Sequence, residues 1–297
     1  MQPRTVRTPS AVRAAIRLLA DDDARVWRAC RLRLRSWGED ARDELERAAA
    51  DDDARLRVQA RRLLRTIDLD AWLRDFVSGV RAARFGVESD GVLETGLRRL
   101  CGFNWRGGDG DALARRLDQL AAELRPFVCG RSTLTAARRL AELFAQRHDF
   151  AGVRAPGRSH DDWLPDRVAR SGRGPASVLA AIYLLVARRA GVTVSGVLLP
   201  DFVLVRVHGR RRILVDPFHR GRSETKADCR RYLRRMLPNR PVAERLCDVD
   251  DGEVLVRVLE DLILVHDRPE DGELRDALRR ARLDLLPGRC RAAQIQL

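Results

Sequence analysis

The strongest constraint on the fold of this chain is a segment that is apolar on nearly every side. Ser177 is followed by the run Val178 to Val186, which contains no charged residue. An α-helix that is hydrophobic all round must be buried by other elements of its domain. Arg188 and Arg189 suit the negative end of such a helix, and Gly191 suits a stop just beyond it. The sequence therefore predicts a central buried helix that starts near Ser177.

Two strand-like segments follow this helix. They run from Phe202 to Val207 and from Ile213 to Phe218, and His208 to Arg212 form the turn between them. Side chains alternate between the faces of a strand, so Phe202 and Asp216 share a face if the turn has an odd length, and do not if it has an even length. A buried helix packed on a small antiparallel sheet is an α+β architecture.

The same segments contain a candidate catalytic layout. A nucleophile-type residue at a helix start, followed by residues on two strands, is typical of sites in which a thiol is served by a histidine and an aspartate. Here the first position is Ser177, the third is Asp216, and the position that needs an imidazole is Phe202. A hydroxyl without an adjacent base is a weak nucleophile at neutral pH. We therefore expect none of the three residues to be catalytic.

These motifs resemble the SirB-type transglutaminase-like family. The similar segments are GPASVLAAIYLLVARRAG (174–191), GVLLPDFVLVRV (196–207) and ILVDPFHRG (213–221), together with residues 93–105, 140–154 and 257–287, in the family's order. The resemblance implies a papain/transglutaminase-like core with C-terminal helices. It also implies a degenerate triad at Ser177, Phe202 and Asp216, because Asp201-Phe202 stand where the family has Gly-His.

Each candidate residue also has a structural interpretation, which we favour. Ser177 suits the N-cap of the buried helix, and Asp216 suits a turn in which its carboxylate accepts local backbone hydrogen bonds. Tyr183, inside the helix, needs a hydrogen-bond partner for its hydroxyl. One route to activity stays open, in which His160 from the irregular segment before the helix supplies the missing base. His208 lies too far along its strand for this role, His219 has the wrong strand parity unless Pro217 bends the chain, and nothing ties His266 to the site.

The positive charge of the chain is almost entirely arginine. The net charge is +14, and Lys226 is the only lysine. The clusters Arg210 to Arg212, Arg230-Arg231 and Arg234-Arg235 lack a nucleic-acid motif and the interleaved aromatic residues of a base-stacking surface. We interpret them as a solvated surface, compatible with weak, salt-sensitive and nonspecific nucleic-acid binding.

The sequence predicts no cofactor and no metal. Its six cysteines are scattered, without a CxxC pair or histidines at ligand spacing, which argues against a zinc site and a disulfide framework. No glycine-rich phosphate-binding pattern is present. The stretch Ala14 to Ala20 is interrupted by Arg17 and is too short for a signal sequence or a membrane span. We expect a cytoplasmic protein with no membrane association.

The N-terminal part contains a repeat. LADDDARVWRACRLRLRSWG (19–38) is followed by AADDDARLRVQARRLLRTI (49–67), and each copy has an aspartate cluster that suits a helix start. Helix pairs at this period are typical of a HEAT-like unit, and a plain helical bundle with similar capping is an equal alternative. We predict an N-terminal helical unit at 1–88, a transglutaminase-like core at 89–238 and a C-terminal helical segment at 239–297.

Three functions are compatible with these patterns. The first is a non-catalytic protein-binding or regulatory module, which we favour because Phe202 stands where a base is needed. The second is a serine-dependent hydrolase or acyltransferase that uses Ser177 with a base from elsewhere. The third is a basic nucleic-acid-associated protein.

Overall fold

A computed structural model describes residues 8–86, 91–103, 108–155, 160–237 and 246–286, and for residues 160 and 161 it describes the backbone alone. The chain forms two compact units, residues 1–73 and 74–297. The predicted domain boundaries at 88/89 and 238/239 fall outside the described residues. Within those residues, no helix combines the length and apolar character needed to cross a membrane.

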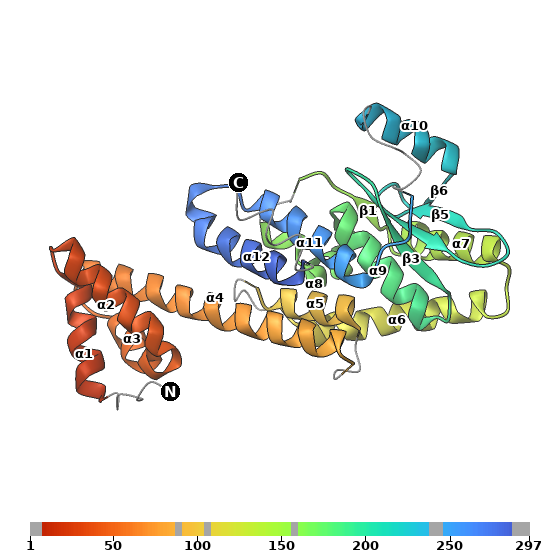
Figure 1. The fold of residues 1–297 in the computed structure, drawn as a ribbon. Coiled ribbons are helices and arrows are strands. Elements are labelled where there is room, and N and C mark those ends of the chain that lie inside the picture. Colours follow the sequence, from red (N-terminus) through yellow and green to blue (C-terminus); the bar gives the residue numbers. More distant parts are fainter. Residues whose placement is uncertain (1–7, 87–90, 104–107, 156–159, 238–245, 287–297) are drawn as a thin grey trace. The chain divides into compact units, whose positions relative to one another are not determined.

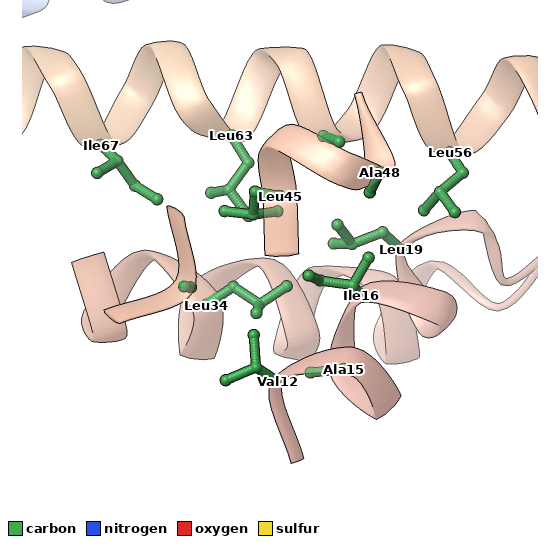
Figure 2. Close-up of a cluster of buried hydrophobic side chains, with 12 residues drawn as sticks. Val12, Ala15, Ile16, Leu19, Leu34, Leu45, Ala48, Leu56, Leu63 and Ile67 are labelled. Carbon is green, nitrogen blue, oxygen red and sulfur yellow. The ribbon is translucent and has the colours of Figure 1, made fainter. Parts of the chain in front are cut away.

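The first unit is helical. Its elements are α1 (Pro9–Arg17), η1 (Leu18–Ala20), α2 (Ala24–Trp37), η2 (Gly38–Ala41), α3 (Arg42–Ala48) and the first part of α4 (Ala54–Arg84). Leu34 and Leu45 are fully buried in an apolar cluster that α1, α2, α3 and α4 share (Figure 2). At its edge Arg35 of α2 donates two hydrogen bonds to Asp70 of α4, each 2.6 Å long. Apolar side chains at helical spacing therefore give this unit a core of its own.

The two aspartate clusters cap helices, as the sequence predicts. The carboxylate of Asp23 accepts a hydrogen bond from the backbone N–H of Arg25 at the start of α2. Asp53 does the same for Arg55 and Leu56 at the start of α4. Each carboxylate satisfies N–H groups that have no partner within the helix.

The second unit is a mostly helical α+β structure (Figure 1). Its helices are α5 (Val92–Cys101), α6 (Gly110–Val128), α7 (Thr133–Ala141), η3 (Glu142–Arg147), η4 (His160–Trp163), α8 (Pro165–Ser171), α9 (Ala176–Arg189), α10 (Lys226–Met236), α11 (Asp251–Val265), η6 (Pro269–Asp271) and α12 (Gly272–Leu285). Its strands are β1 (Ala151–Gly152), β2 (Arg173–Gly174), β3 (Val194–Leu198), β4 (Val203–Val207), β5 (Ile213–Asp216) and β6 (Arg222–Glu224).

The buried helix predicted after Ser177 is α9. Every residue from Ala176 to Ala187 is buried. Helix α9 packs against α6, α11, β3 and β4, so other elements enclose it on several sides. The predicted α+β core with a central buried helix and a small antiparallel sheet is confirmed.

The main sheet is antiparallel, in the order β3-β4-β5-β6. Val207 of β4 pairs with Ile213 of β5, so the connection is 208–212 and its length is odd. Odd parity places Leu204, Leu214 and Asp216 on one face, where the first two pack with Cys229 and Leu233 of α10. Phe202 lies just before β4, which begins at Val203. The predicted hairpin is confirmed, whereas the sequence analysis did not identify β3 and β6.

Tyr183 differs from its sequence prediction. Its ring is fully buried and stacks on Phe144, with the ring centroids 3.8 Å apart. Among the described residues its hydroxyl has no hydrogen-bond partner, although the sequence predicts one. Burial raises the pKa of this hydroxyl above its ordinary value, because the interior disfavours a phenolate.

Replacing Tyr183 by phenylalanine is therefore expected to stabilise the protein. A buried hydroxyl without a partner costs about 1 to 3 kcal/mol, so its removal is expected to raise the free energy of unfolding by about 1 kcal/mol. Urea unfolding of the wild type and of Tyr183→Phe measures this difference. A loss of stability in the variant would contradict the absence of a partner.

Candidate functional site

The start of α9 places Ser177 inside the first helical turn. Pro175 is the N-cap residue, with an extended backbone (φ −70°, ψ 161°), and provides no side-chain cap. Ser177 is 0% exposed, and its hydroxyl donates a 2.7 Å hydrogen bond to Oδ2 of Asp261. The prediction that Ser177 is the N-cap is wrong, because Pro175 takes that position and moves Ser177 into the helix.

Asp261 comes from α11, far from Ser177 in the sequence. Its carboxylate also forms an ion pair with Arg257, one helical turn earlier, at 3.5 Å. Arg257 in turn donates a 2.6 Å hydrogen bond to the carbonyl of Pro200, in the connection between β3 and β4. Burial raises the pKa of the Asp261 carboxyl above its ordinary value of 3.8. The group that faces the Ser177 hydroxyl is therefore the carboxyl group of Asp261 and not an imidazole.

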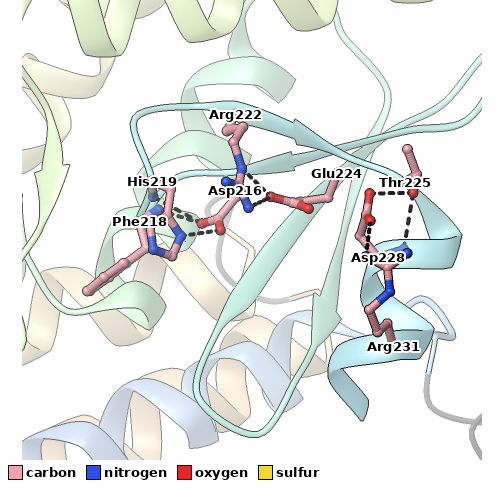
Figure 3. A network of polar contacts seen from close by, with 8 residues as sticks. All are labelled: Asp216, Phe218, His219, Arg222, Glu224, Thr225, Asp228 and Arg231. Atoms are coloured by element: carbon pink, nitrogen blue, oxygen red, sulfur yellow. Dashed lines mark hydrogen bonds and ion pairs between the residues drawn. The ribbon is translucent and has the colours of Figure 1, made fainter. Parts of the chain in front are cut away.

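Asp216 holds the turn that follows β5 (Figure 3). Its Oδ1 accepts hydrogen bonds from the backbone N–H groups of Phe218 (2.9 Å) and His219 (3.2 Å), which is the local role predicted for it. Its Oδ2 lies 2.6 Å from Nδ1 of His219. Strand parity argues against this pairing, but β5 ends at Asp216, and the turn from Pro217 brings the imidazole back.

Phe202 lies beside the Asp216–His219 pair. Its ring centroid is 5.2 Å from that of His219, 5.5 Å from that of Phe218 and 5.7 Å from that of Tyr232. Tyr232 of α10 donates a 2.6 Å hydrogen bond to Asp201, and burial raises the pKa of Tyr232 to about 12. An aromatic cluster therefore surrounds the position where a catalytic imidazole is expected.

A pocket of about 150 Å³ lies next to these residues. Its lining residues come from the segment after β1, the end of η4, the start of α9, the β3–β4 connection, the turn after β5 and α11: Val153, Arg154, Trp163, Pro175, Ala176, Asp201, Phe202, Phe218, Asp261 and Leu264. Leu264, on α11, is 71% exposed. The lining of the pocket therefore combines apolar side chains with the carboxylate of Asp261, which accepts the hydrogen bond from Ser177.

The other histidines have partners elsewhere or are not described. His148 lies 2.8 Å from Glu123, and His208 lies 2.8 Å from the hydroxyl of Ser195. His266 is buried beside the ring of Phe103. The side chain of His160, proposed as a replacement base, lies outside the described residues.

The sequence analysis did not identify Asp261. One signal was available, since Arg257 and Asp261 are spaced i, i+4 in α11, in a segment that is apolar apart from these two residues and Glu260. That spacing indicates a local ion pair, but it does not indicate that the carboxylate faces a residue 84 positions earlier.

The raised pKa of Asp261 predicts a pH dependence of stability. The folded protein keeps this proton to higher pH than the unfolded chain, so stability falls as the pH rises from about 3.8 through the folded pKa. Asp261→Asn lacks this titration. The free energy of unfolding of the wild type, relative to the variant, is therefore expected to decrease across that window and to stay level above it. Urea unfolding at a series of pH values measures this, and the opposite slope would contradict burial as the cause.

Comparison with known proteins places these residues in a family. The family model of the Transglutaminase-like superfamily matches residues 111–260, which is just over half of the chain and includes Ser177, Phe202 and Asp216. Asp261 is the residue directly after the matched segment. Comparison with curated proteins and with solved structures gives no significant match. The chain therefore belongs to the transglutaminase-like superfamily.

Proposed function

We propose that this protein is a non-catalytic member of the superfamily, and that its pocket beside α9 binds a protein partner. The observation that carries the proposal is the state of Ser177, which is 0% exposed and donates its hydroxyl hydrogen to Asp261. A nucleophile must reach its substrate and transfer its proton to a base. The burial of Ser177 argues against contact between its hydroxyl and a substrate.

The surroundings of Phe202 support the same proposal. In a triad, the aspartate orients a histidine that takes the nucleophile's proton. Here Asp216 binds His219 through the turn that follows β5, while the hydrogen bond of Ser177 goes to Asp261. The apolar ring of Phe202 packs between His219, Phe218 and Tyr232 and offers no group that could accept a proton.

The pocket walls favour an apolar side chain of a partner protein. Trp163, Phe202 and Phe218 provide aromatic surface, and exposed Leu264 extends it. Aromatic pockets of this kind hold the anchor residues of protein interfaces. Arg154, also in the lining and exposed, is a donor for a backbone carbonyl or carboxylate of the same partner.

The proposal includes two finer assignments. The motifs at 174–221 support a SirB-type affiliation with a degenerate triad. The repeated aspartate-capped helices α2 and α4 support a HEAT-like N-terminal unit that provides a further binding surface.

The distance between the Ser177 hydroxyl and the Asp261 carboxylate favours a second candidate function, that of a serine-dependent enzyme. The 2.7 Å contact of Ser177 with Asp261 is within the reach required between a nucleophile and a general base. Burial raises the pKa of Asp261, which makes the carboxylate a stronger proton acceptor when it is ionised. This arrangement would support a serine-dependent hydrolase or acyltransferase if the substrate could reach the hydroxyl.

Reaction with activated esters and thioesters distinguishes the two candidates. The native chain, Ser177→Ala and Asp261→Asn are each mixed with the same panel, and the product burst and the intact mass are recorded. The proposal predicts no burst and no acyl adduct that depends on Ser177. A burst that disappears in both variants would overturn it in favour of the Ser177–Asp261 pair, and a burst abolished only in Ser177→Ala would overturn it in favour of another base.

A further inference from the structure

The solvent face of α10 is strongly basic. Lys226, Arg230, Arg231, Arg234 and Arg235 are all exposed on this helix of 11 residues. Lys226, Arg230 and Arg234 have no ion-pair partner among the described residues, and Arg231 lies 3.7 Å from Asp228 with its side chain 81% exposed. The opposite face carries Cys229 and Leu233, which are buried against the sheet. Because the apolar face of α10 packs on the sheet, its cationic side chains point toward solvent.

The β4–β5 hairpin adds a second group of cations. Arg210, Arg211 and Arg212 are exposed at its tip and form no ion pair within the described part of the chain. In β6, Glu224 pairs with Leu214, next to the first residue of β5. Strand β6 therefore ends at the hairpin end of the sheet, and α10 begins two residues later. The hairpin tip and the start of α10 lie at the same end of the sheet.

Some of the arginines elsewhere in this unit are engaged in ion pairs. Arg189 contacts both Glu94 and Asp118, Arg188 contacts Asp251, and Arg282 contacts Glu260. The hairpin and α10 differ from these positions in that they bring several exposed cations without an ion-pair partner to one end of the sheet.

We propose that this surface, formed by residues 210–212 and the exposed face of α10, binds the phosphate backbone of a nucleic-acid duplex. Guanidinium groups form bidentate, charge-assisted hydrogen bonds with phosphate. From Lys226 to Arg235 the helix rises about 14 Å, a span along which a duplex presents several phosphates. Such contacts depend on the charge of the phosphates and not on the base sequence of the duplex.

The composition of the surface favours a duplex over other polyanions. Insertion into a membrane needs exposed apolar residues beside the cations, and on α10 the exposed large apolar residue is Met236, at 40%. Single strands bind through stacking on exposed aromatic rings, whereas Tyr232 is bonded to Asp201 and covered by Arg235. The hot spots of protein interfaces cluster in well-packed, desolvated pockets, whereas these cations are exposed on a helix face and a hairpin tip.

Fluorescence anisotropy of a labelled duplex, at salt concentrations from about 50 to 200 mM, tests the proposal on the full chain. The variants are Arg230→Gln with Arg234→Gln on α10, and Arg210→Gln with Arg211→Gln on the hairpin. The matched control is Arg279→Gln with Arg280→Gln, which removes the same charge from exposed positions on α12, away from α10 (Figure 1).

Each test pair is expected to weaken binding and to reduce the slope of log affinity against log salt by about 2, since each phosphate that the protein no longer neutralises lowers it by about 0.9. The control pair is expected to leave the slope unchanged. The proposal is overturned if the duplex does not bind at low salt, or if the control weakens binding as much as the test pairs. Tighter binding to a single strand, or to vesicles containing phosphatidylserine, would also overturn it.

Discussion

Replacing Gly221 by alanine is expected to lower the free energy of unfolding by about 3 kcal/mol, from left-handed strain of about 1 to 2 kcal/mol and overpacking of about 1 to 3 kcal/mol. Gly221 has φ +74°, and its N–H donates a 2.8 Å hydrogen bond to the carbonyl of Asp216. An added Cβ would lie 2.8 Å from Cα and 2.6 Å from Cβ of Ala141 in α7. Backbone cannot move away as a flexible side chain can, so the turn that carries His219 must shift.

Gly191 provides the matched control. It has φ +84°, but an added Cβ would meet nothing within 4 Å. Gly191→Ala therefore tests the left-handed strain alone, and we expect a loss of about 1 kcal/mol. Urea unfolding followed by circular dichroism measures both variants. Equal losses would show that the close approach to α7 contributes nothing.

Phe144→Ala is expected to destabilise the second unit by about 3 to 5 kcal/mol, because it removes a large side chain from a packed core. Phe144 is fully buried, stacks on Tyr183 and meets the ring of Phe150 edge-on, with the centroids 4.9 Å apart. Its carbonyl also accepts the N–H of Phe150, just before β1. The ring therefore links α9 to the strand that leads into the pocket.

Phe127→Ala is the control for the loss of a phenyl ring. Phe127 is 38% exposed and is covered by the guanidinium groups of Arg139 and Arg147. Its removal leaves less of a cavity, so the expected loss is about 1 kcal/mol. The same unfolding measurement applies to both variants. A loss in Phe127→Ala as large as that in Phe144→Ala would contradict burial as the source of the difference.

Local patterns account for the parts of the fold that the sequence predicted. The apolar run after Ser177 requires enclosure, and α9 is enclosed. The aspartates at 23 and 53 can satisfy N–H groups two residues away, so their capping role is readable without tertiary information. The hairpin itself was predictable, whereas the sequence left its turn length open, and the odd length that the structure shows fixes which residues share a face.

The site required information that local patterns lack. The Ser177–Asp261 hydrogen bond joins the start of α9 to α11, and no periodicity indicates which carboxylate reaches a buried hydroxyl. The alternation of side chains between the two faces of a strand does not place His219 correctly. This alternation holds only while the chain stays extended, and β5 ends at Asp216, three residues before His219. The N-cap assignment failed by two positions because Pro175 already has the backbone conformation of a cap.

Alkylation of Ser177→Cys tests the central claim most directly. The claim is that the side chain at position 177 is buried from solvent and is not activated as a nucleophile. The variant is treated with iodoacetamide under native conditions, and the labelled peptides are mapped over time, with exposed Cys129 as the internal reference. The account predicts that Cys129 is labelled while the new thiol stays unmodified until the protein is unfolded. Labelling of the new thiol faster than Cys129 in the folded protein would show an accessible, activated nucleophile position and would contradict the account.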